Sequence, residues 1–146
     1  MIQRIQTIWL FLASLLSGAL FISPLYKYNV NTASGIEAQW LQANNFYPLL
    51  ILAVVMTLVP LAAIFMYGDR KKQKRMSFIF ILSCVSFITI MVMRIAHLRT
   101  SIQGISNDQY AIPGSVLPFI AAVFGAMAIF NINKDEKLVR SMDRLR

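Results

Sequence analysis

The chain has 146 residues, of which 58% are hydrophobic and 14% are charged. Its mean hydropathy of +0.62 is too high for an ordinary soluble domain of this size and predicts a single membrane domain over residues 1–146. The formal net charge of +8 does not indicate nucleic-acid binding, because the basic residues lie between apolar runs and not on one soluble face. The single cysteine, Cys84, lies inside an apolar run, which excludes a disulfide framework or a paired thiol.

Four apolar stretches predict four transmembrane helices. A bilayer core about 30 Å thick needs roughly 20 apolar residues in helical form, because hydrocarbon offers the backbone no hydrogen-bond partner. The expected spans are residues 5–22, 46–67, 77–97 and 115–132, so the predicted fold class is all-α, an integral membrane four-helix bundle. The first stretch is long for a signal-peptide core and no clear cleavage site follows it, so we expect it to be retained as a helix.

Two prolines inside the predicted spans are expected to act differently. Ser115 is a good N-cap residue, which would place Pro118 at the third helical position, where a proline costs no internal hydrogen bond and causes no kink. Pro60 lies well inside the second span and removes the hydrogen bond to the carbonyl of Met56. It therefore predicts a helix kink, with Thr57 taking up part of the freed hydrogen bonding.

The distribution of basic residues predicts the orientation in a bacterial inner membrane. Residues 69–75 and 134–146 each contain five Lys or Arg residues, and Arg4 adds another, whereas the opposite side carries Lys27 and Arg99, with Arg94 at its border. By the positive-inside rule, both termini and the segment 69–75 lie in the cytoplasm. The two remaining connections then face the periplasm: residues 23–45 and 98–114.

A short interfacial helix is predicted in the first periplasmic connection. Ser34 and Glu37 have the spacing of a capping box, which starts a helix. Ile36, Trp40 and Leu41 would then share one apolar face. Such a face fits a helix at the membrane interface, and we favour this anchoring role over a docking surface for a periplasmic partner.

An amphipathic helix is predicted for the cytoplasmic tail, residues 134–146. Asn133 and Glu136 are spaced as an N-cap and a third helical residue. The candidate residues for lipid or partner docking are an apolar stripe and a basic group: Leu138, Met142 and Leu145, with Arg140, Arg144 and Arg146. We favour a helix that lies on anionic lipid over a helix that docks on a protein.

Few residues in the spans are suited to chemistry. No Asp or Glu lies inside a predicted span, which argues against a proton-driven exporter acting alone. His97 is the only histidine, which argues against a haem held by two histidines and against a metal site. We therefore expect no cofactor and no enzymatic activity.

Three polar residues form a candidate site at the periplasmic end of the third span. Arg94 and His97 are three residues apart and share a face, and Arg99 follows closely. We favour side chains that reach the lipid headgroups over an anion or partner site in which Asp108 or Glu37 closes an ion pair.

Small residues in the first and fourth spans predict close helix packing. Gly18 follows Ser14 by four residues, and Gly125 follows Ala121 at the same interval. Such pairs let helix backbones approach closely. We favour packing within the monomer over contacts in a homo-oligomer.

The two ends of the chain have distinctive sequences, MIQRIQT at residues 1–7 and KDEKLVRSMDRLR at residues 134–146. With these ends and four apolar spans between them, the chain resembles a family of small bacterial inner-membrane proteins described only as a domain of unknown function. The resemblance implies four helices and a cytoplasmic terminal motif, with no assigned activity.

These features predict a non-enzymatic accessory or scaffold subunit of a bacterial inner-membrane complex. Its expected partners are the lipid bilayer and a membrane protein or a second copy of the chain. The competing interpretation is a small transport or channel component, for which Pro60, Arg94 and His97 would be the working parts. A water-filled cavity reaching Arg94 would favour it.

Overall fold

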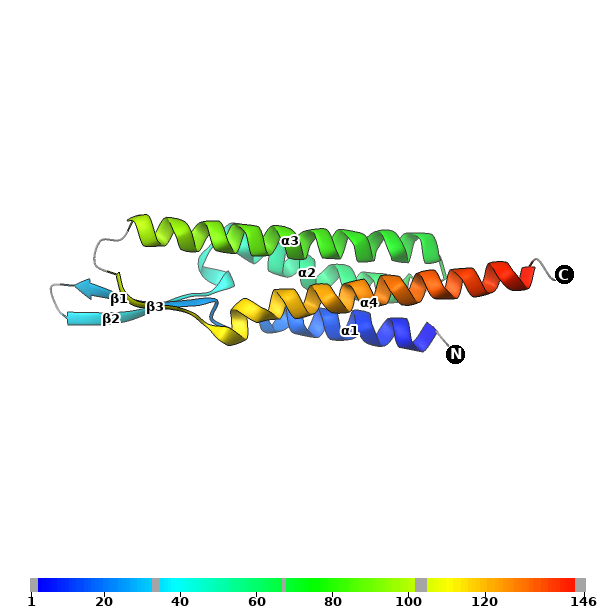
Figure 1. Ribbon diagram of the computed structural model, residues 1–146, viewed down its shortest axis with the longest axis horizontal. Coiled ribbons are helices and arrows are strands. Elements are labelled where there is room, and N and C mark those ends of the chain that lie inside the picture. Colours follow the sequence, from blue (N-terminus) through cyan, green and yellow to red (C-terminus); the bar gives the residue numbers. More distant parts are fainter. Residues whose placement is uncertain (1–2, 33–34, 67, 102–104, 144–146) are drawn as a thin grey trace.

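The computed structural model describes residues 3–32, 35–66, 68–101 and 105–143. Its elements in chain order are α1 (Gln3–Ala19), β1 (Tyr26–Thr32), β2 (Gly35–Leu41), η1 (Ala43–Asn45), α2 (Tyr47–Phe65), α3 (Arg70–Ser101), β3 (Ile105–Tyr110) and α4 (Ile112–Asp143). The four helices form an elongated bundle, and the three strands extend from one end of it (Figure 1). The prediction of four helices is confirmed, whereas the prediction of an all-α fold is wrong because the chain also forms a sheet.

Successive helices of the bundle run in opposite directions (Figure 1). Helices α1 and α3 each pack against both α2 and α4, so the four helices enclose one interior. Large buried side chains fill it, including Leu49, Met56, Phe80 and Phe87. We call the end that carries the strands the sheet end, and the opposite end, where α3 begins and α4 ends, the basic end.

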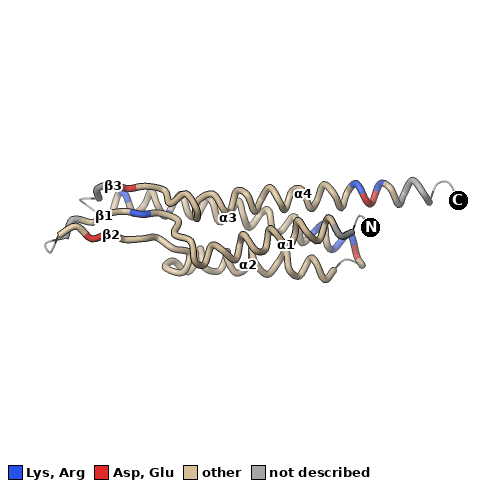
Figure 2. The backbone as a smooth tube through the Cα atoms, turned by 90° about the horizontal axis from the view of Figure 1, so that it is seen from below, with Lys and Arg blue, Asp and Glu red and all other residues tan. Residues whose placement is uncertain are grey.

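The outside of the bundle is also apolar. Phe11, Leu58, Phe78 and Phe130 are all more than half exposed. Figure 2 shows the charged residues gathered at the two ends, with the middle of the bundle free of them. Helices α2, α3 and α4 are long and apolar enough to cross a membrane, whereas the apolar part of α1, Ile5–Ala19, is shorter. Apolar side chains facing outward would be unfavourable in water and are favourable in lipid.

Helix α3 extends beyond the predicted span at its N-terminal end. It begins at Arg70, so the predicted connection 69–75 is mostly helical. The side chain of Asp69 explains this start, because its Oδ1 accepts a hydrogen bond of 3.2 Å from the backbone N–H of Lys72 and so caps the helix. The chain between α2 and α3 is therefore short. Helix α1 ends before its predicted limit, at Ala19 and not at residue 22.

Helix α4 begins before Ser115, the predicted N-cap. The backbone N–H of Ala111 donates to the carbonyl of Leu25, and the N–H of Ser115 already donates to the carbonyl of Ala111. The helix starts at Ile112, so Pro118 lies beyond the first turn and removes a hydrogen bond to the carbonyl of Gly114. The expectation that this proline costs no internal hydrogen bond was wrong.

The predicted separate tail helix is the last part of α4. The helix continues without a break through Asn133 to Asp143. Asn133 therefore does not act as an N-cap, because good helix formers such as Lys134 and Glu136 follow it and no helix breaker precedes it. The part of α4 beyond the apolar span is a continuous helical extension of that span.

The predicted interfacial helix is a strand of an antiparallel sheet with the order β2-β1-β3. Ile36 and Trp40 lie on one face of β2, while Leu41 points to the other face and is buried. Glu37 lies opposite Val30 of β1 and not in a helical first turn. Ladder hydrogen bonds to β1 outweigh the local capping-box signal; Ser34 lies outside the described residues.

The main chain around Leu25 joins the sheet to the bundle. The N–H of Leu25 donates to the carbonyl of Leu41, and the carbonyl of Leu25 accepts from the N–H of Ala111. Gly114 packs against the same segment so closely that a Cβ atom there would lie 2.1 Å from the carbonyl oxygen of Pro24. The start of α4 therefore requires glycine at this position.

Pro60 lies inside α2 and is buried in the bundle. The Thr57 hydroxyl donates to the carbonyl of Ala53 at 2.8 Å and not to the carbonyl that Pro60 leaves free. The carbonyl of Thr57 accepts a hydrogen bond of 3.0 Å from the Ser14 hydroxyl of α1. Polar side chains thus join α1 to α2 close to the proline.

Candidate functional site

Strand β2 is an edge strand of the sheet. In the part of the chain that the structure describes, the strand order leaves one side of β2 without a strand partner, and all its side chains before Leu41 are exposed. Ile36, Ala38 and Trp40 form an apolar row on one face, because strand residues alternate between faces. Ile36 is 71% exposed and Trp40 is 45% exposed. Lys27 of β1 lies over the Trp40 ring, with its Nζ 4.2 Å from the ring centroid.

The opposite face of the sheet contacts the C-terminal end of α3 through a polar cluster. The hydroxyl of Tyr26 donates to Oδ2 of Asp108 at 2.6 Å. Arg99 donates from Nε to the Tyr26 hydroxyl at 3.1 Å, and its Nη2 lies 2.7 Å from the same Asp108 oxygen. The guanidinium group also lies over the rings of Tyr26 and Tyr110, 5.7 Å from each centroid. This cluster links β1, β3 and α3.

The contacts within the cluster shift the pKa values of Tyr26 and Asp108. The hydrogen bond from Tyr26 lowers the pKa of Asp108, and the charge of Arg99 acts in the same direction. Burial raises the pKa of Tyr26. The carboxylate is therefore charged and the phenol neutral at neutral pH, which keeps both hydrogen bonds in place.

A pocket of about 340 Å³ lies beside α2 and α3 at the sheet end. Its lining residues are mostly apolar: Phe46, Pro48, Ile90, Met93, Arg94 and His97. The guanidinium carbon of Arg94 is 4.9 Å from the centroid of the Phe46 ring. Its Nε atom is buried and has no hydrogen-bond partner in the described part of the chain. Arg94 therefore lies against the Phe46 ring with one buried donor that none of the described residues satisfies.

The three polar residues predicted as one site belong to two separate sites. Arg94 and His97 line the pocket together, whereas Arg99 belongs to the Tyr26 cluster. His97 is exposed, and its Nδ1 is 3.2 Å from the Ser101 hydroxyl. Of the two acids proposed to close an ion pair, Asp108 does so, with Arg99.

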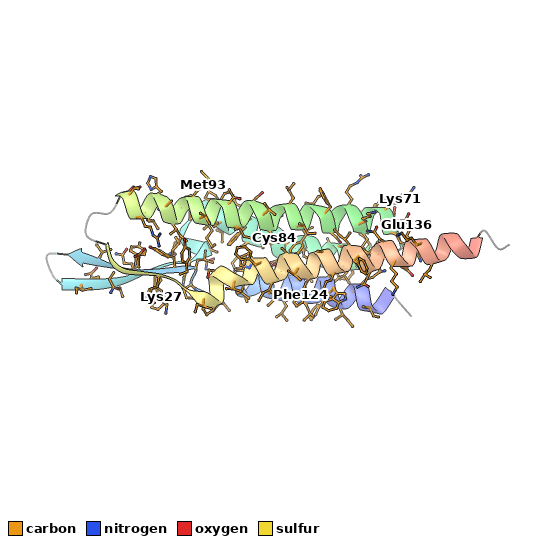
Figure 3. The ribbon with its side chains drawn as sticks, in the orientation of Figure 1. Lys27, Lys71, Cys84, Met93, Phe124 and Glu136 are labelled. Atoms are coloured by element: carbon orange, nitrogen blue, oxygen red, sulfur yellow. The ribbon has the colours of Figure 1, made fainter. Side chains whose placement is uncertain are left out.

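The basic end contains a half-buried ion pair and several exposed cations. Nη2 of Arg70 lies 3.2 Å from Oδ2 of Asp135, joining the first turn of α3 to the extension of α4. That oxygen is buried and receives no hydrogen bond of good geometry, so the contact is electrostatic. Figure 3 shows Lys71 and Glu136 at this same end.

The small residues predicted for helix packing lie at helix contacts. A Cβ atom on Gly125 would lie 2.7 Å from Phe80, so α4 contacts α3 closely there. Ala121 is fully buried one turn earlier. Gly18 is less crowded, since its nearest such neighbour is Thr57 at 3.9 Å.

The predicted docking residues of the tail are described only in part. Leu138 is partly exposed on α4. The helix continues through Arg140 and Met142, but their side chains lie outside the description, as do all of Arg144, Leu145 and Arg146. Within the described residues, no group of three or more His, Cys, Asp or Glu side chains could hold a metal ion.

The sequence interpretation overlooked the sheet and the role of Tyr26. Alternation in β1 was a usable signal, since Tyr26, Tyr28 and Val30 face one way and the polar Lys27 and Asn29 face the other. Nothing local reveals that Tyr26 lies beside Asp108, because the two residues come together only when β1 pairs with β3.

These features define a class of protein: a four-helix bundle with three helices long and apolar enough to span a membrane, and a three-stranded sheet at one end. The chain belongs to the family described as Domain of unknown function (DUF4293), whose model matches residues 2–145. The predicted membership of such a family is confirmed. No curated protein and no solved structure matches the chain.

Proposed function

We propose that the chain is a non-enzymatic accessory or scaffold subunit of a bacterial inner-membrane complex, and that it holds its partner through β2. The observation that supports this proposal most directly is the exposed edge strand. Within the described residues, β2 has no strand partner on one side, and it carries the exposed row Ile36, Ala38 and Trp40 on one face. Of its backbone groups, the carbonyl of Trp40 accepts a hydrogen bond from the side chain of Asn45. An added strand would gain main-chain hydrogen bonds from the edge and side-chain contacts from the row. Edges of this kind are usually shielded unless they bind something.

The orientation inferred from the basic residues supports a periplasmic site. The charge-rich turns of α3 and α4 lie at the end opposite the sheet (Figure 2). The positive-inside rule then places β2 in the periplasm. The partner is accordingly a membrane protein with an extended periplasmic segment, or a periplasmic protein.

Symmetry argues against a second copy of the chain as the occupant. β2 runs roughly along the bundle axis (Figure 1), so two copies in one membrane would pair their β2 strands in parallel. A two-fold axis would place identical residues opposite each other. In a parallel pair, however, a residue whose N–H and C=O groups point toward the partner strand lies opposite a residue whose N–H and C=O groups point away from it. Two identical residues related by a two-fold axis cannot meet this requirement. A heterologous strand meets no such restriction.

The test compares two changes of β2 on opposite faces. Ile36→Glu combined with Trp40→Glu removes the two large side chains of the apolar row, and the new carboxylate at position 40 faces Lys27, which preserves the strand pairing. Gln39→Glu is the matched control, because a carboxylate there still accepts the hydrogen bond of the Tyr28 hydroxyl. Tagged proteins are purified from native membranes in mild detergent, and bound proteins are identified by mass spectrometry.

We expect a stoichiometric partner with the wild type and with Gln39→Glu, and its loss with the double variant. Recovery of the wild-type chain alone would contradict the proposal. It would favour the transport interpretation, for which the pocket at Arg94 is the relevant feature. That pocket is mainly apolar, and its lining residues all lie near the sheet end, which supports a transport path less well than a docking role.

A further inference from the structure

A basic groove lies between α3 and α4 at the basic end. It is a pocket of about 310 Å³ lined by Lys71, Lys74, Arg75, Phe78 and Ile129. The four residues from α3 follow the i, i+3, i+4, i+7 spacing and therefore share one face of the helix. The result is a rim of three cations above a floor of two apolar side chains.

The three cations have no acidic partner within the described residues. The ion pairs at this end join Arg70 to Asp135 and Lys72 to Asp69. Lys71, Lys74 and Arg75 are all exposed and lie within little more than one helical turn. Their mutual repulsion would fall if an anion bound among them.

A polar pocket adjoins the groove and shares Lys74 with it. Its volume is about 410 Å³, and its other lining residues are Asn133, Glu136 and Lys137. Asn133 offers an acceptor that cations alone do not, which suits a hydroxyl group. The charged rim is thus bordered by an apolar floor on one side and a hydrogen-bonding pocket on the other.

We propose that this groove binds the headgroup of an anionic phospholipid of the phosphatidylglycerol type. The phosphate lies among Lys71, Lys74 and Arg75, the glycerol hydroxyls reach the polar pocket, and an acyl chain lies over Phe78 and Ile129. Phe78 is 64% exposed and continues into the apolar exterior of the bundle, which a soluble phosphate would leave uncovered. Basic pockets at helix ends are typical sites for anionic headgroups. This proposal is independent of the role of β2.

The experiment measures lipid binding to the purified full chain by native mass spectrometry. Dioleoyl phosphatidylglycerol is titrated into detergent, with dioleoyl phosphatidylcholine as the uncharged comparison. The groove variant combines Lys71→Gln with Arg75→Gln. The matched control combines Lys72→Gln with Lys134→Gln, which removes the same charge from the same end but from residues that do not line the groove.

We expect wild type and control to bind phosphatidylglycerol alike, and the groove variant to need a roughly 30-fold higher lipid concentration for half-saturation. Equal losses in both variants would show a general surface charge effect and overturn the proposal. Equal binding of the two lipids would also overturn it. Displacement of the lipid by millimolar inorganic phosphate would show that the rim binds free phosphate, which contradicts a lipid site. Thermal unfolding of each variant confirms that it is folded.

Discussion

Gly114 is the residue whose side-chain size is most tightly restricted. A Cβ atom there would overlap the main chain of Pro24. Main-chain atoms cannot move aside as the end of a flexible side chain could. We expect Gly114→Ala to destabilise the chain by about 2–3 kcal/mol, at the upper part of the range for overpacking. Thermal unfolding in detergent measures this effect. Gly18→Ala is the control and should change stability little, since its nearest such contact is 3.9 Å away. Equal stability of the two variants would contradict the close packing at Gly114.

The Tyr26 cluster predicts that the sheet end is sensitive to strong acid. The folded-state pKa of Asp108 is lowered. Its contribution to stability is therefore complete above the ordinary aspartate pKa and is lost as the pH falls through the lowered value. Fluorescence of Trp40, measured in a Trp9→Phe background, should change over that acidic range. Asp108→Asn should abolish the change.

Asp69 provides the control for the acid transition. Its pKa is also lowered, by the hydrogen bond from the backbone of Lys72, but it lies at the basic end. Asp69→Asn should leave the fluorescence transition of Trp40 unaltered. If it removed the transition as completely as Asp108→Asn, the signal would report general unfolding and not the Tyr26 cluster.

At the scale of elements, the extension of α4 is held against α3 by the Arg70–Asp135 pair. A double-mutant cycle with Arg70→Gln and Asp135→Asn should give a coupling free energy on the order of 1 kcal/mol. The exposed pair of Lys72 and Asp69 should give a smaller value, because solvent screens it. Unfolding in detergent with increasing denaturant measures both. Zero coupling between Arg70 and Asp135 would mean that the ion pair does not help to hold the extension against α3.

Hydropathy predicted the helices well because a long run of apolar residues can be recognised without knowing any tertiary contact. The same reasoning gave incorrect ends, since Asp69 caps α3 and Ala111 starts α4 through contacts outside the apolar runs. The sheet was missed for a related reason. The capping-box spacing of Ser34 and Glu37 is a local helix signal, whereas the competing strand is stabilised by β1 and, through β1, by distant β3.

The candidate site was predictable only in its charged parts. Arg94, His97 and Arg99 stood out as polar residues at the end of an apolar span, but their division between two sites depends on how α3 packs. The sequence offered Asp108 and Glu37 equally as partners for these three residues. Only the pairing of β1 with β3 places Asp108 beside Arg99, and Tyr26 with it.

For the whole molecule, the orientation is open to a direct test. In a Cys84→Ala background, Ala38→Cys marks the sheet end and Lys134→Cys marks the basic end; both positions are exposed. A membrane-impermeant maleimide added to spheroplasts should label position 38 at once and position 134 only after lysis. The reverse pattern would place β2 in the cytoplasm and contradict its proposed periplasmic partner. Labelling of both positions before lysis would indicate leaky membranes, which a cytoplasmic marker enzyme detects.

The distance between two cations along α3 limits the bilayer thickness that the helix can match. Arg75 and Arg94 are separated by a continuous helix without proline. At 1.5 Å per residue, that separation is about 28 Å, close to the hydrocarbon thickness of an ordinary bilayer. In a membrane several ångströms thicker, one guanidinium group would lie in the hydrocarbon, or the bilayer would become thinner around the bundle. Hydrophobic mismatch therefore opposes entry of this chain into thick membranes, whatever partner it binds.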